Sequence, residues 1–557
     1  MKKFALLLAL SCFWFSGGFS QKDFYKNYQF TKADTLRGML RPERTVYDVT
    51  FYDLNLKIEP DRHFVSGYVD IYFKAVKSFK TLQIDLFENM HISKIEHKGG
   101  EMRFDRLHAA VFVDLLPGYN QGESGRFRIY YEGYPTTAQN PPWDGGFVWK
   151  KDSAGKDWIG VACEGTGASL WWPNKDHLSD EPDSMAINIS VPDGLMCVSN
   201  GNLRATTPES GGFTNWHWFV SYPINNYNVS VNIADYAHFS DVWVASDGDS
   251  LACDYYVLKE NLEIAKIQFA QVQGMFDCYE KYFGKYPFWR DGFAMVETPY
   301  LGMEHQSGIA YGNQYKRGYL GGRIPKDMSW DYIIIHETGH EWWGNSISSR
   351  DHAEMWIHEA FTTYMEALYV ECTMSYADAM RYLRSQRPFI VNAEPMLGAF
   401  DVNFDRWRSS DNYYKGTWFL NTLRHAVGDD VLWFDILKSF YEKHAYQNIV
   451  TADFLNYMND KTGRDWSRVF EQYLTYPKIP VLLYKLEEKN GGVILKYKWQ
   501  ADVAGFDMPA LAGNAEAYER IFPTEKWQEK RFENVKKEAF KIGSDVMLIE
   551  AMLRAED

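Results

Sequence analysis

Apolar and polar residues alternate along the first part of the chain. Residues 46–58 show this alternation with many β-branched and aromatic residues, and residues 69–73 and 127–131 repeat it between turns rich in Gly, Pro and Asp. A period of two residues is typical of a strand with one buried face. The pattern predicts a large antiparallel β region over about residues 45–235.

The spacing of apolar residues changes to a helical period after about residue 240. It recurs over residues 260–283, 376–383, 417–427 and 431–442, while the run at residues 292–296 suits a strand of a small sheet. Apolar residues three or four positions apart favour helices with one buried face. This second region is therefore predicted to be mainly helical.

Alternation returns near the end of the chain, in residues 481–486 and 493–499, and predicts a small β-sandwich. A chain of 557 residues is too long for one ordinary hydrophobic core. We therefore expect an N-terminal β domain over residues 21–240, a mainly helical domain over 241–475 and a C-terminal β-sandwich over 476–557.

The first 20 residues have the pattern of a secretory signal peptide. Two lysines precede the apolar run Phe4–Phe15, and the small residues Gly18 and Ser20 precede a cleavage point before Gln21. The run is too short to span a bilayer, and no later segment reaches about 18 uninterrupted apolar residues. The chain is therefore predicted to be exported by a bacterium, to the periplasm or the medium, without a transmembrane segment.

Cys12 raises the alternative of a lipid-attachment site, which the bulky residues 13–15 disfavour. Removal of the signal leaves five scattered cysteines, Cys163, Cys197, Cys253, Cys278 and Cys372. Such a set is no disulfide framework, although one pair remains possible in an exported protein. The net charge of −15 argues against nucleic acid and anionic membranes as partners.

The most informative motif is His336-Glu337-Thr338-Gly339-His340, which Glu359 follows after eighteen residues. Residues four apart lie on one face of a helix, so His336 and His340 can bind one metal ion together. Glu337 lies about 100° around the helix, where it can act on a water without being a ligand. With Glu359 as third ligand, the set is that of a catalytic zinc site with one open position.

The five-residue motif also occurs by chance on polar helices, so its context matters. Apolar residues 331–335 precede the motif and Trp342 and Trp343 follow it, and residues 355–368 form a second, mainly apolar helix that carries Glu359. Histidines and carboxylates on buried helices are costly unless a charge compensates them. A single Zn²⁺ per chain provides that compensation.

These residues give the chain its resemblance to a known family. The zinc motif, Trp343-Gly344-Asn345 and the segment 356–361 are similar to those of the gluzincin aminopeptidases, the family of aminopeptidase N and leukotriene hydrolase. Leu301-Gly302-Met303-Glu304-His305 resembles the family's Gly-x-Met-Glu-Asn, and Tyr413-Tyr414-Lys415-Gly416 its Tyr-Glu-Lys-Gly. The chain looks like a short, three-domain, secreted bacterial member: a β saddle, a thermolysin-like domain and a small β domain.

The resemblance implies roles for further residues. Glu337 would be the general base and Tyr413 the donor to the oxyanion. Glu304 and Glu164, with Gly302 and Met303 beside them, would bind substrate. Two neighbouring carboxylates repel one another unless a cation lies between them, and the α-ammonium group of a peptide is such a cation.

The chain departs from the family at Leu301, His305 and Ala162, where the family has Gly, Asn and often Gln. These changes affect the expected substrate preference more than the reaction. Glu354 is interpreted either as a partner that orients a metal-binding histidine or as a surface carboxylate. His358 is predicted to be structural and His352 to be solvated.

The sequence thus predicts a zinc aminopeptidase acting on peptides with a free N-terminus, as a monomer or weak homo-oligomer. A thermolysin-type endopeptidase, an epoxide hydrolase and a non-catalytic binding scaffold are the alternatives. The scaffold is disfavoured because His336, Glu337, His340 and Glu359 are all present. The preferred N-terminal residue does not follow from the sequence, because loops form the walls of the pocket.

Overall fold

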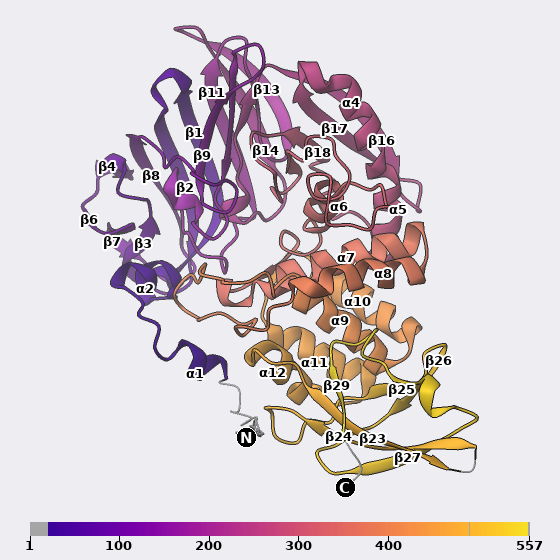
Figure 1. Cartoon of the computed structure of the whole chain (residues 1–557). Helices are drawn as coiled ribbons and strands as arrows, with labels where there is room; N and C mark the ends of the chain where they lie inside the picture. Colours follow the sequence, from indigo (N-terminus) through magenta and orange to yellow (C-terminus); the bar gives the residue numbers. More distant parts are fainter. Residues whose placement is uncertain (1–19, 490, 555–557) are drawn as a thin grey trace, which may run out of the picture.

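The structure is a computed structural model and describes residues 20–489 and 491–554. Apart from Ser20, the predicted signal peptide lies outside the described residues, and so does Cys12. Figure 1 shows a sheet-rich N-terminal region, helices in the middle of the molecule and a second, smaller group of strands at the C-terminal end. Among the described residues, no helix is both long and apolar enough to cross a membrane.

Three short helices that the sequence pattern did not predict precede the first strand. They are α1 (Gln21–Tyr25), α2 (Lys32–Gly38) and α3 (Pro42–Thr45). Tyr25 packs edge-on against Phe404, with ring centroids 5.1 Å apart, and Gln21 donates a hydrogen bond to the carbonyl of Gly398. The N-terminal segment therefore lies against a distant loop of the helical region.

The predicted N-terminal β region contains an eight-stranded sheet. Its order is β13 (Asn202–Glu209), β14 (Phe213–Val220), β11 (Ser184–Pro192), β1 (Tyr47–Glu59), β2 (Phe64–Ala75), β8 (Ser124–Gly133), β4 (Met90–His97) and β5 (Gly100–Glu101). Neighbouring strands are antiparallel as predicted, except that β1 pairs with β11 in parallel. A parallel pair needs a long crossover, which the residues between these two strands provide.

Two smaller sheets complete this region. One contains β3 (Phe79–Asp85), β7 (Ala110–Tyr119) and β6 (Phe104–Leu107), and the other contains β12 (Met196–Val198), β15 (Asn232–Ala234), β10 (Asp157–Ala162) and β9 (Gly146–Lys151). Alternate residues of β1 and β2 are buried in a common hydrophobic core, as the period of two requires.

A five-stranded sheet leads into the helices. Its order is β16 (Tyr236–Val244), β17 (Ser250–Leu258), β18 (Phe293–Glu297), β20 (Gly308–Tyr311) and β19 (Gly302–Met303). The predicted strand at residues 292–296 is therefore confirmed as β18. Every residue of β18 is buried, which explains the apolar run that precedes Glu297 in the sequence.

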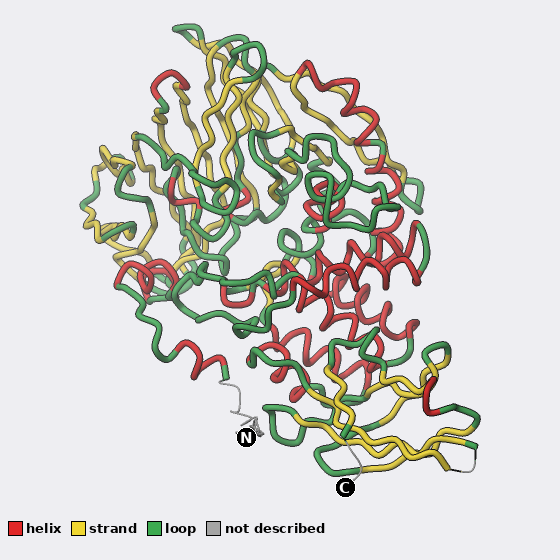
Figure 2. Tube along the Cα trace, in the orientation of Figure 1, coloured by secondary structure: helices red, strands yellow, loops and turns green. Residues whose placement is uncertain are grey.

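The helical region contains all the predicted helices, and two further helices follow them in the chain (Figure 2). Its helices are α4 (Leu262–Phe269), α5 (Gln271–Phe283), α6 (Tyr332–Gly339), α7 (Trp356–Thr373), α8 (Tyr376–Gln386), α9 (Tyr414–Val427), α10 (Asp430–His444), α11 (Thr451–Thr462) and α12 (Ser467–Thr475). The predicted stretch 260–283 is divided into α4 and α5 at Ala270. A small parallel pair, β21 (Ile347–Ser349) and β22 (Gln447–Ile449), joins the loops between helices.

A disulfide bond joins Cys278 of α5 to Cys372 of α7. The sequence allowed one such pair without identifying its cysteines. Cys163, Cys197 and Cys253 are buried free thiols. Helix α7 lies at the centre of the helical region and is buried along its first fifteen residues. The cross-link therefore ties the central helix to a neighbour that packs against it.

The C-terminal region consists of two sheets. The first has the order β27 (Gln528–Glu533), β24 (Gly492–Gln500), β23 (Val481–Lys489) and β29 (Glu550–Leu553), and the second has β26 (Ala517–Ile521), β25 (Ala510–Asn514) and β28 (Phe540–Ile542). The predicted alternation in residues 481–486 and 493–499 is thus that of two paired strands, β23 and β24.

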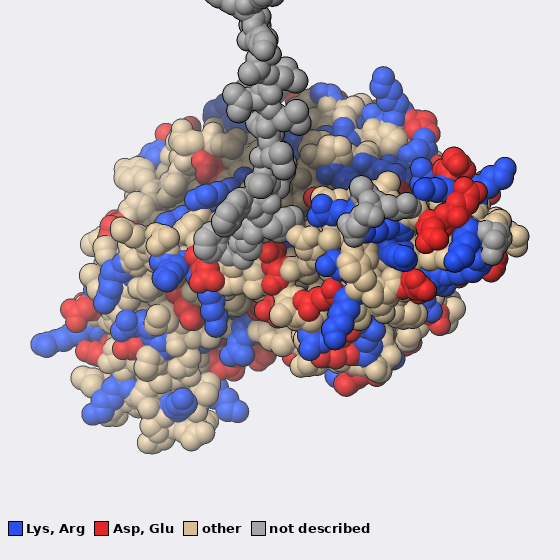
Figure 3. All heavy atoms as spheres, turned by 60° about the horizontal axis from the view of Figure 1, so that its bottom comes forward, with Lys and Arg blue, Asp and Glu red and all other residues tan. Residues whose placement is uncertain are grey.

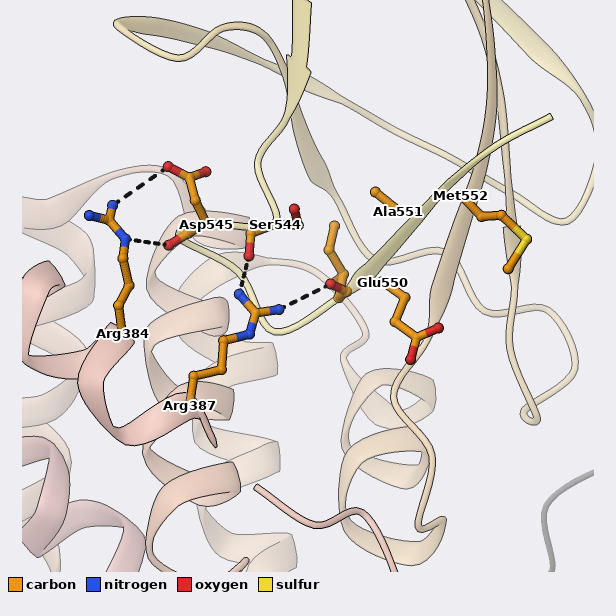
Figure 4. A pocket seen from close by; sticks show the side chains of 8 residues that line it. Arg384, Arg387, Ser544, Asp545, Glu550, Ala551 and Met552 are labelled. Carbon is orange, nitrogen blue, oxygen red and sulfur yellow. Dashed lines mark hydrogen bonds and ion pairs between the residues drawn. The ribbon is translucent and has the colours of Figure 1, made fainter. Parts of the chain in front are cut away.

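Two arginines, Arg384 of α8 and Arg387 directly after it, contact the C-terminal region (Figure 4). Arg384 pairs with Asp545 at 3.5 Å, and Arg387 donates to the carbonyl oxygens of Ser544 and Ile549. The face shown in Figure 3 carries basic and acidic side chains side by side. On that face the net charge of −15 is not gathered into one acidic patch.

Candidate metal centre and substrate cavity

Helix α6 presents the two histidines of the motif on one buried face. The Asp331 side chain caps the helix by accepting a hydrogen bond from the backbone N–H of Ile333 at 3.0 Å. The Nε2 atoms of His336 and His340 are 3.2 Å apart, as expected for residues one turn apart. The sequence therefore places two imidazole nitrogens at one point.

Glu359, in the first turn of α7, completes this group. Its Oε2 atom lies 3.6 Å from Nε2 of His336 and 3.5 Å from Nε2 of His340. The three ligand atoms lie within 4.8 Å of one another, and all three residues are buried. The buried Oε2 of Glu359 has no hydrogen-bond partner among the described residues. Two imidazole nitrogens and one otherwise unpaired carboxylate oxygen fit a zinc ion with an open fourth position.

A second layer of residues orients the histidines. Nδ1 of His336 lies 2.6 Å from Oε1 of Glu366, and Nδ1 of His340 lies 2.9 Å from the carbonyl oxygen of Trp343. Glu366 also accepts a hydrogen bond from the hydroxyl of Tyr382. Such partners fix which ring nitrogen is free to bind a metal.

Glu366 was missed by the sequence reasoning, which considered Glu354 for this role. Glu354 is no surface carboxylate: it is buried, and it accepts a hydrogen bond from the backbone N–H of Thr451 at 2.7 Å. Glu366 lies seven residues after Glu359, which is two turns along the same face of α7. That spacing is the signal that could have identified it.

Glu337 lies on α6 directly beneath strand β19. A Cβ atom added at Gly302 would stand 2.8 Å from Oε1 of Glu337 and 2.8 Å from Cγ2 of Ile333. Only a residue without a side chain allows the strand to pass this close to the helix. Gly302 therefore brings β19, with Met303 and the following Glu304, against the proposed base.

Tyr413 stands at the start of α9 beside the metal ligands. Its hydroxyl donates a hydrogen bond to Oε1 of Glu359 at 2.7 Å, and its ring stacks on His336 with centroids 5.9 Å apart. Tyr414 also lines the cavity, but no hydrogen bond joins it to the three ligands among the described residues. The structure thus places the first of the two adjacent tyrosines at the ligands.

Glu304 and Glu164 reach the cavity from different regions of the fold. Glu304 follows β19, and its Oε1 accepts a hydrogen bond from the hydroxyl of Tyr227 at 3.0 Å. Glu164 follows β10, and its buried Oε1 has no partner among the described residues. Tyr227, which orients Glu304, carried no sequence signal.

Both carboxylates are costly to ionise in this cavity. Burial first, and then repulsion from Glu304, raises the pKa of Glu164 well above its usual value. Burial is also the largest cause that raises the pKa of Glu304. An ammonium group between them would reverse both effects, because a nearby positive charge favours the ionised carboxylate.

The three departures from the family motif lie in different environments. Leu301 lines the cavity, whereas His305 and Ala162 are fully buried and do not. Burial lowers the pKa of His305 to about 3, so its ring is neutral. Of the three, only Leu301 can contact a substrate in the cavity directly.

Two other histidines near the site were considered from the sequence. The prediction that His352 is solvated is wrong, because this residue is buried at the cavity wall and its pKa is lowered to about 4 by burial. His358 is buried, and its Nε2 accepts a hydrogen bond from the backbone N–H of Ser349 at 2.8 Å. His358 therefore holds the loop before α7, in line with the structural role predicted for it.

All the predicted site residues border one cavity of about 550 Å³. Its walls come from the N-terminal β region, from β19 and α6, and from two loops, residues 312–331 and residues 391–413. Further lining residues are Trp143, Tyr319, Arg323, Tyr332, Asp405, Arg408 and Asn412. The volume is that of a small-molecule or short-peptide site.

A paired-histidine helix, a carboxylate from the next helix and an adjacent glutamate are the parts of a zinc metallopeptidase centre. Residues 267–473 match the peptidase family M1 domain, which confirms the predicted resemblance to the gluzincin aminopeptidase family.

Curated relatives include aminopeptidase N of Streptomyces lividans, 23% identical over 62% of this chain and 41% of that protein. Aminopeptidase B of Mus musculus is 28% identical over 48% of this chain and 41% of that protein. The chain thus spans about two fifths of the length of these relatives.

Among solved structures, an M1 zinc metallopeptidase variant from Deinococcus radiodurans bound to a Tyr-Ser-Ala substrate has a TM-score of 0.66. It is 19% identical, and the match covers 78% of this chain and 95% of that one. This likeness shows a common fold, with the sheet-rich N-terminal and helical regions described above.

Proposed function

We propose that this chain is a zinc-dependent aminopeptidase that removes single residues from peptides with a free N-terminus. The observation that carries the proposal is the pair of carboxylates in the cavity wall, buried Glu304 and partly buried Glu164, beside the three proposed metal ligands. An endopeptidase has no need of two negative charges at this point, whereas an aminopeptidase must bind an α-ammonium group there. The relatives named aminopeptidase N and B support the same reaction.

One zinc ion, held by His336, His340 and Glu359, would lower the pKa of a water molecule towards about 7 and polarise a carbonyl group. Glu337 accepts a proton from the attacking water and delivers it to the leaving amine. Its place beneath β19 keeps it beside the peptide bond that follows the anchored ammonium group.

Tyr413 provides a hydrogen-bond donor for the charge that develops on the carbonyl oxygen. Its hydroxyl donates to Glu359 in this structure, which supports a position beside the proposed metal site. A positioned donor of this kind stabilises the transition state more than the substrate. Glu304 and Glu164 meanwhile fix the distance between the ammonium group and the cleaved bond.

An assay with aminoacyl fluorogenic substrates, run with and without a chelator, tests the proposal. Hydrolysis that stops on chelation, returns with zinc and fails on N-acetylated substrates is the expected result. Equal cleavage of blocked and free peptides would instead support an endopeptidase. Metal analysis should give one zinc per chain.

We also infer that the chain is exported, as its predicted signal peptide suggests. The Cys278–Cys372 disulfide supports this location, because such bonds persist in oxidising compartments. Cell fractionation and the mass of the mature N-terminus, expected at Gln21, test the inference. Cleavage before Cys12 with a lipid attached would contradict it.

We further propose that residues 21–240, 241–475 and 476–557 are separate domains and that the protein is a monomer or weak homo-oligomer. Limited proteolysis and light scattering test these two points. Cuts near residues 240 and 475 are expected, together with the mass of a monomer, which is 64.9 kDa for the whole chain and lower once residues 1–20 are removed.

A further inference from the structure

The loop of residues 312–331 forms a wall of the cavity and is held by its own side chains. Arg317 donates hydrogen bonds to the carbonyl oxygens of Met328 at 2.7 Å and Pro325 at 2.5 Å. Asn313 donates to the carbonyl oxygen of Gly318 at 2.8 Å. These side-chain bonds to the backbone give the loop one defined path without regular secondary structure.

The loop presents Arg323 to the cavity. Its φ angle is 59°, in the left-handed region that residues other than glycine rarely adopt. The guanidinium group lies over the ring of Tyr319 at 4.2 Å and 5.9 Å from the centroid of Phe389. Within residues 20–489 and 491–554, no carboxylate forms an ion pair with Arg323. A positive charge in this cavity wall is thus available to a ligand.

Arg323 is connected to the metal ligands through two aromatic rings, Tyr319 and Tyr332. His336 stacks on Tyr332 at 5.0 Å, Tyr332 packs edge-on against Tyr319 at 5.6 Å, and the guanidinium group lies over Tyr319. Ligand atoms of Glu304, Glu337 and His340 lie within 4.8 Å of one another. Within this cavity, carboxylates therefore approach the metal ligands by one route and the Arg323 guanidinium group by another.

A bound peptide must follow this polarity. With its ammonium group at Glu304 and its first carbonyl group at the metal ligands, the rest of the peptide extends past His336 and Tyr332. An extended chain advances about 3.3–3.6 Å per residue, so the contacts from His336 to Arg323 span at most about four residues. Arg323 is then within reach of the second to fourth residue of the substrate.

From these contacts we infer that Arg323 binds a carboxylate on the leaving part of the substrate and favours short or acidic peptides. The inference rests on the aminopeptidase function proposed above. The carboxylate can be the free C-terminus of a di- or tripeptide or an acidic side chain after the cleaved bond. A guanidinium group is suited to either, because its planar N–H groups match a carboxylate.

Arg408 provides a matched control, since it also lines the cavity and forms no ion pair within the described part of the chain. Its guanidinium group lies 5.3 Å from the ring of Tyr28, in the N-terminal segment, and Tyr28 does not line the cavity. Loss of the Arg408 charge should therefore leave recognition of a substrate carboxylate unaltered.

The test compares kcat/KM for a tripeptide with a free C-terminus and for the same tripeptide as its C-terminal amide. We expect the wild-type acid-to-amide ratio to exceed one and to fall about tenfold in Arg323→Gln, with partial recovery in Arg323→Lys. Arg408→Gln should keep the wild-type ratio. A second comparison uses tripeptide amides with Glu or Gln at the second position. A higher kcat/KM for the Glu peptide, lost in Arg323→Gln, would identify an acidic side chain as the source of the carboxylate.

A wild-type enzyme that treats acid and amide, and Glu and Gln, alike would overturn the inference. An unchanged ratio in Arg323→Gln, in protein with wild-type zinc content and thermal stability, would do the same. If the wild-type protein cleaves none of these peptides, the aminopeptidase function itself is wrong. The two failures are therefore distinguishable.

Discussion

Helices α6 and α7 and the loop of residues 312–331 border the same cavity, but different interactions hold them. Between the helices, Trp343 stacks on Phe361 with centroids 3.9 Å apart, and apolar residues surround the metal ligands. The loop is held by hydrogen bonds from Asn313 and Arg317 to backbone carbonyl oxygens. The proposed metal ligands and Glu337 thus lie at packed helices, whereas Arg323, proposed to bind the rest of the substrate, lies on a loop.

The largest expected effect comes from the reactive group on the helix. Glu337→Gln should lower kcat by about three to five orders of magnitude, because the proton acceptor is lost. Zinc content and thermal stability should stay close to wild type, since Glu337 is not a ligand. Retention of near-normal turnover in this variant, measured with an aminoacyl fluorogenic substrate, would refute the assignment.

Tyr413→Phe should have the next largest effect, lowering kcat by about two to three orders of magnitude, as loss of a single oxyanion donor does. Tyr414→Phe is the matched control and should lose much less activity, because its hydroxyl does not contact Glu359. Comparison of kcat for the two variants separates the adjacent tyrosines. Equal losses would remove the special role of Tyr413.

Glu366→Ala should weaken zinc binding by about 10- to 100-fold, because His336 loses the partner that orients its ring. Glu354→Ala removes a similarly buried carboxylate that accepts a hydrogen bond from Thr451, the first residue of α11. This variant should lower thermal stability and leave the zinc affinity unchanged. Competition with a zinc chelator measures both. The role of Glu366 is wrong if the two variants hold zinc equally well.

The smallest effect is expected from the loop. Asn313→Ala removes side-chain bonds to Gly318 and Asp331 and should raise KM for tripeptides a few-fold while changing kcat less. Steady-state kinetics with a series of tripeptides checks whether KM changes more than kcat. A fall in kcat comparable to that of Tyr413→Phe would mean that loop and helices are not separate in function.

The sequence predicted the parts of the molecule that depend on periodic patterns. Strand β18 and helices α8 and α10 extend over the predicted stretches within a few residues, because burial of one face repeats along each. The spacing of His336 and His340 similarly placed two nitrogens at one point.

Contacts between distant segments were not predictable in this way. The parallel pairing of β1 with β11 joins strands that are far apart in the chain. Tyr227, in the short 3-10 helix Asn226–Asn228, donates a hydrogen bond to Glu304, which is 77 residues away in the chain. Nothing in the sequence around Tyr227 indicates that contact. Burial of His352 likewise depends on how the N-terminal region covers the helices.

The Cys278–Cys372 disulfide closes a covalent ring around the part of the chain that carries His336, His340, Glu359 and Glu366. The three proposed metal ligands and Glu366 are thus contained in one cyclic segment of the polypeptide. Removal of zinc therefore leaves these groups tethered to one another, so the stripped enzyme should take up zinc again and regain activity without a separate refolding treatment.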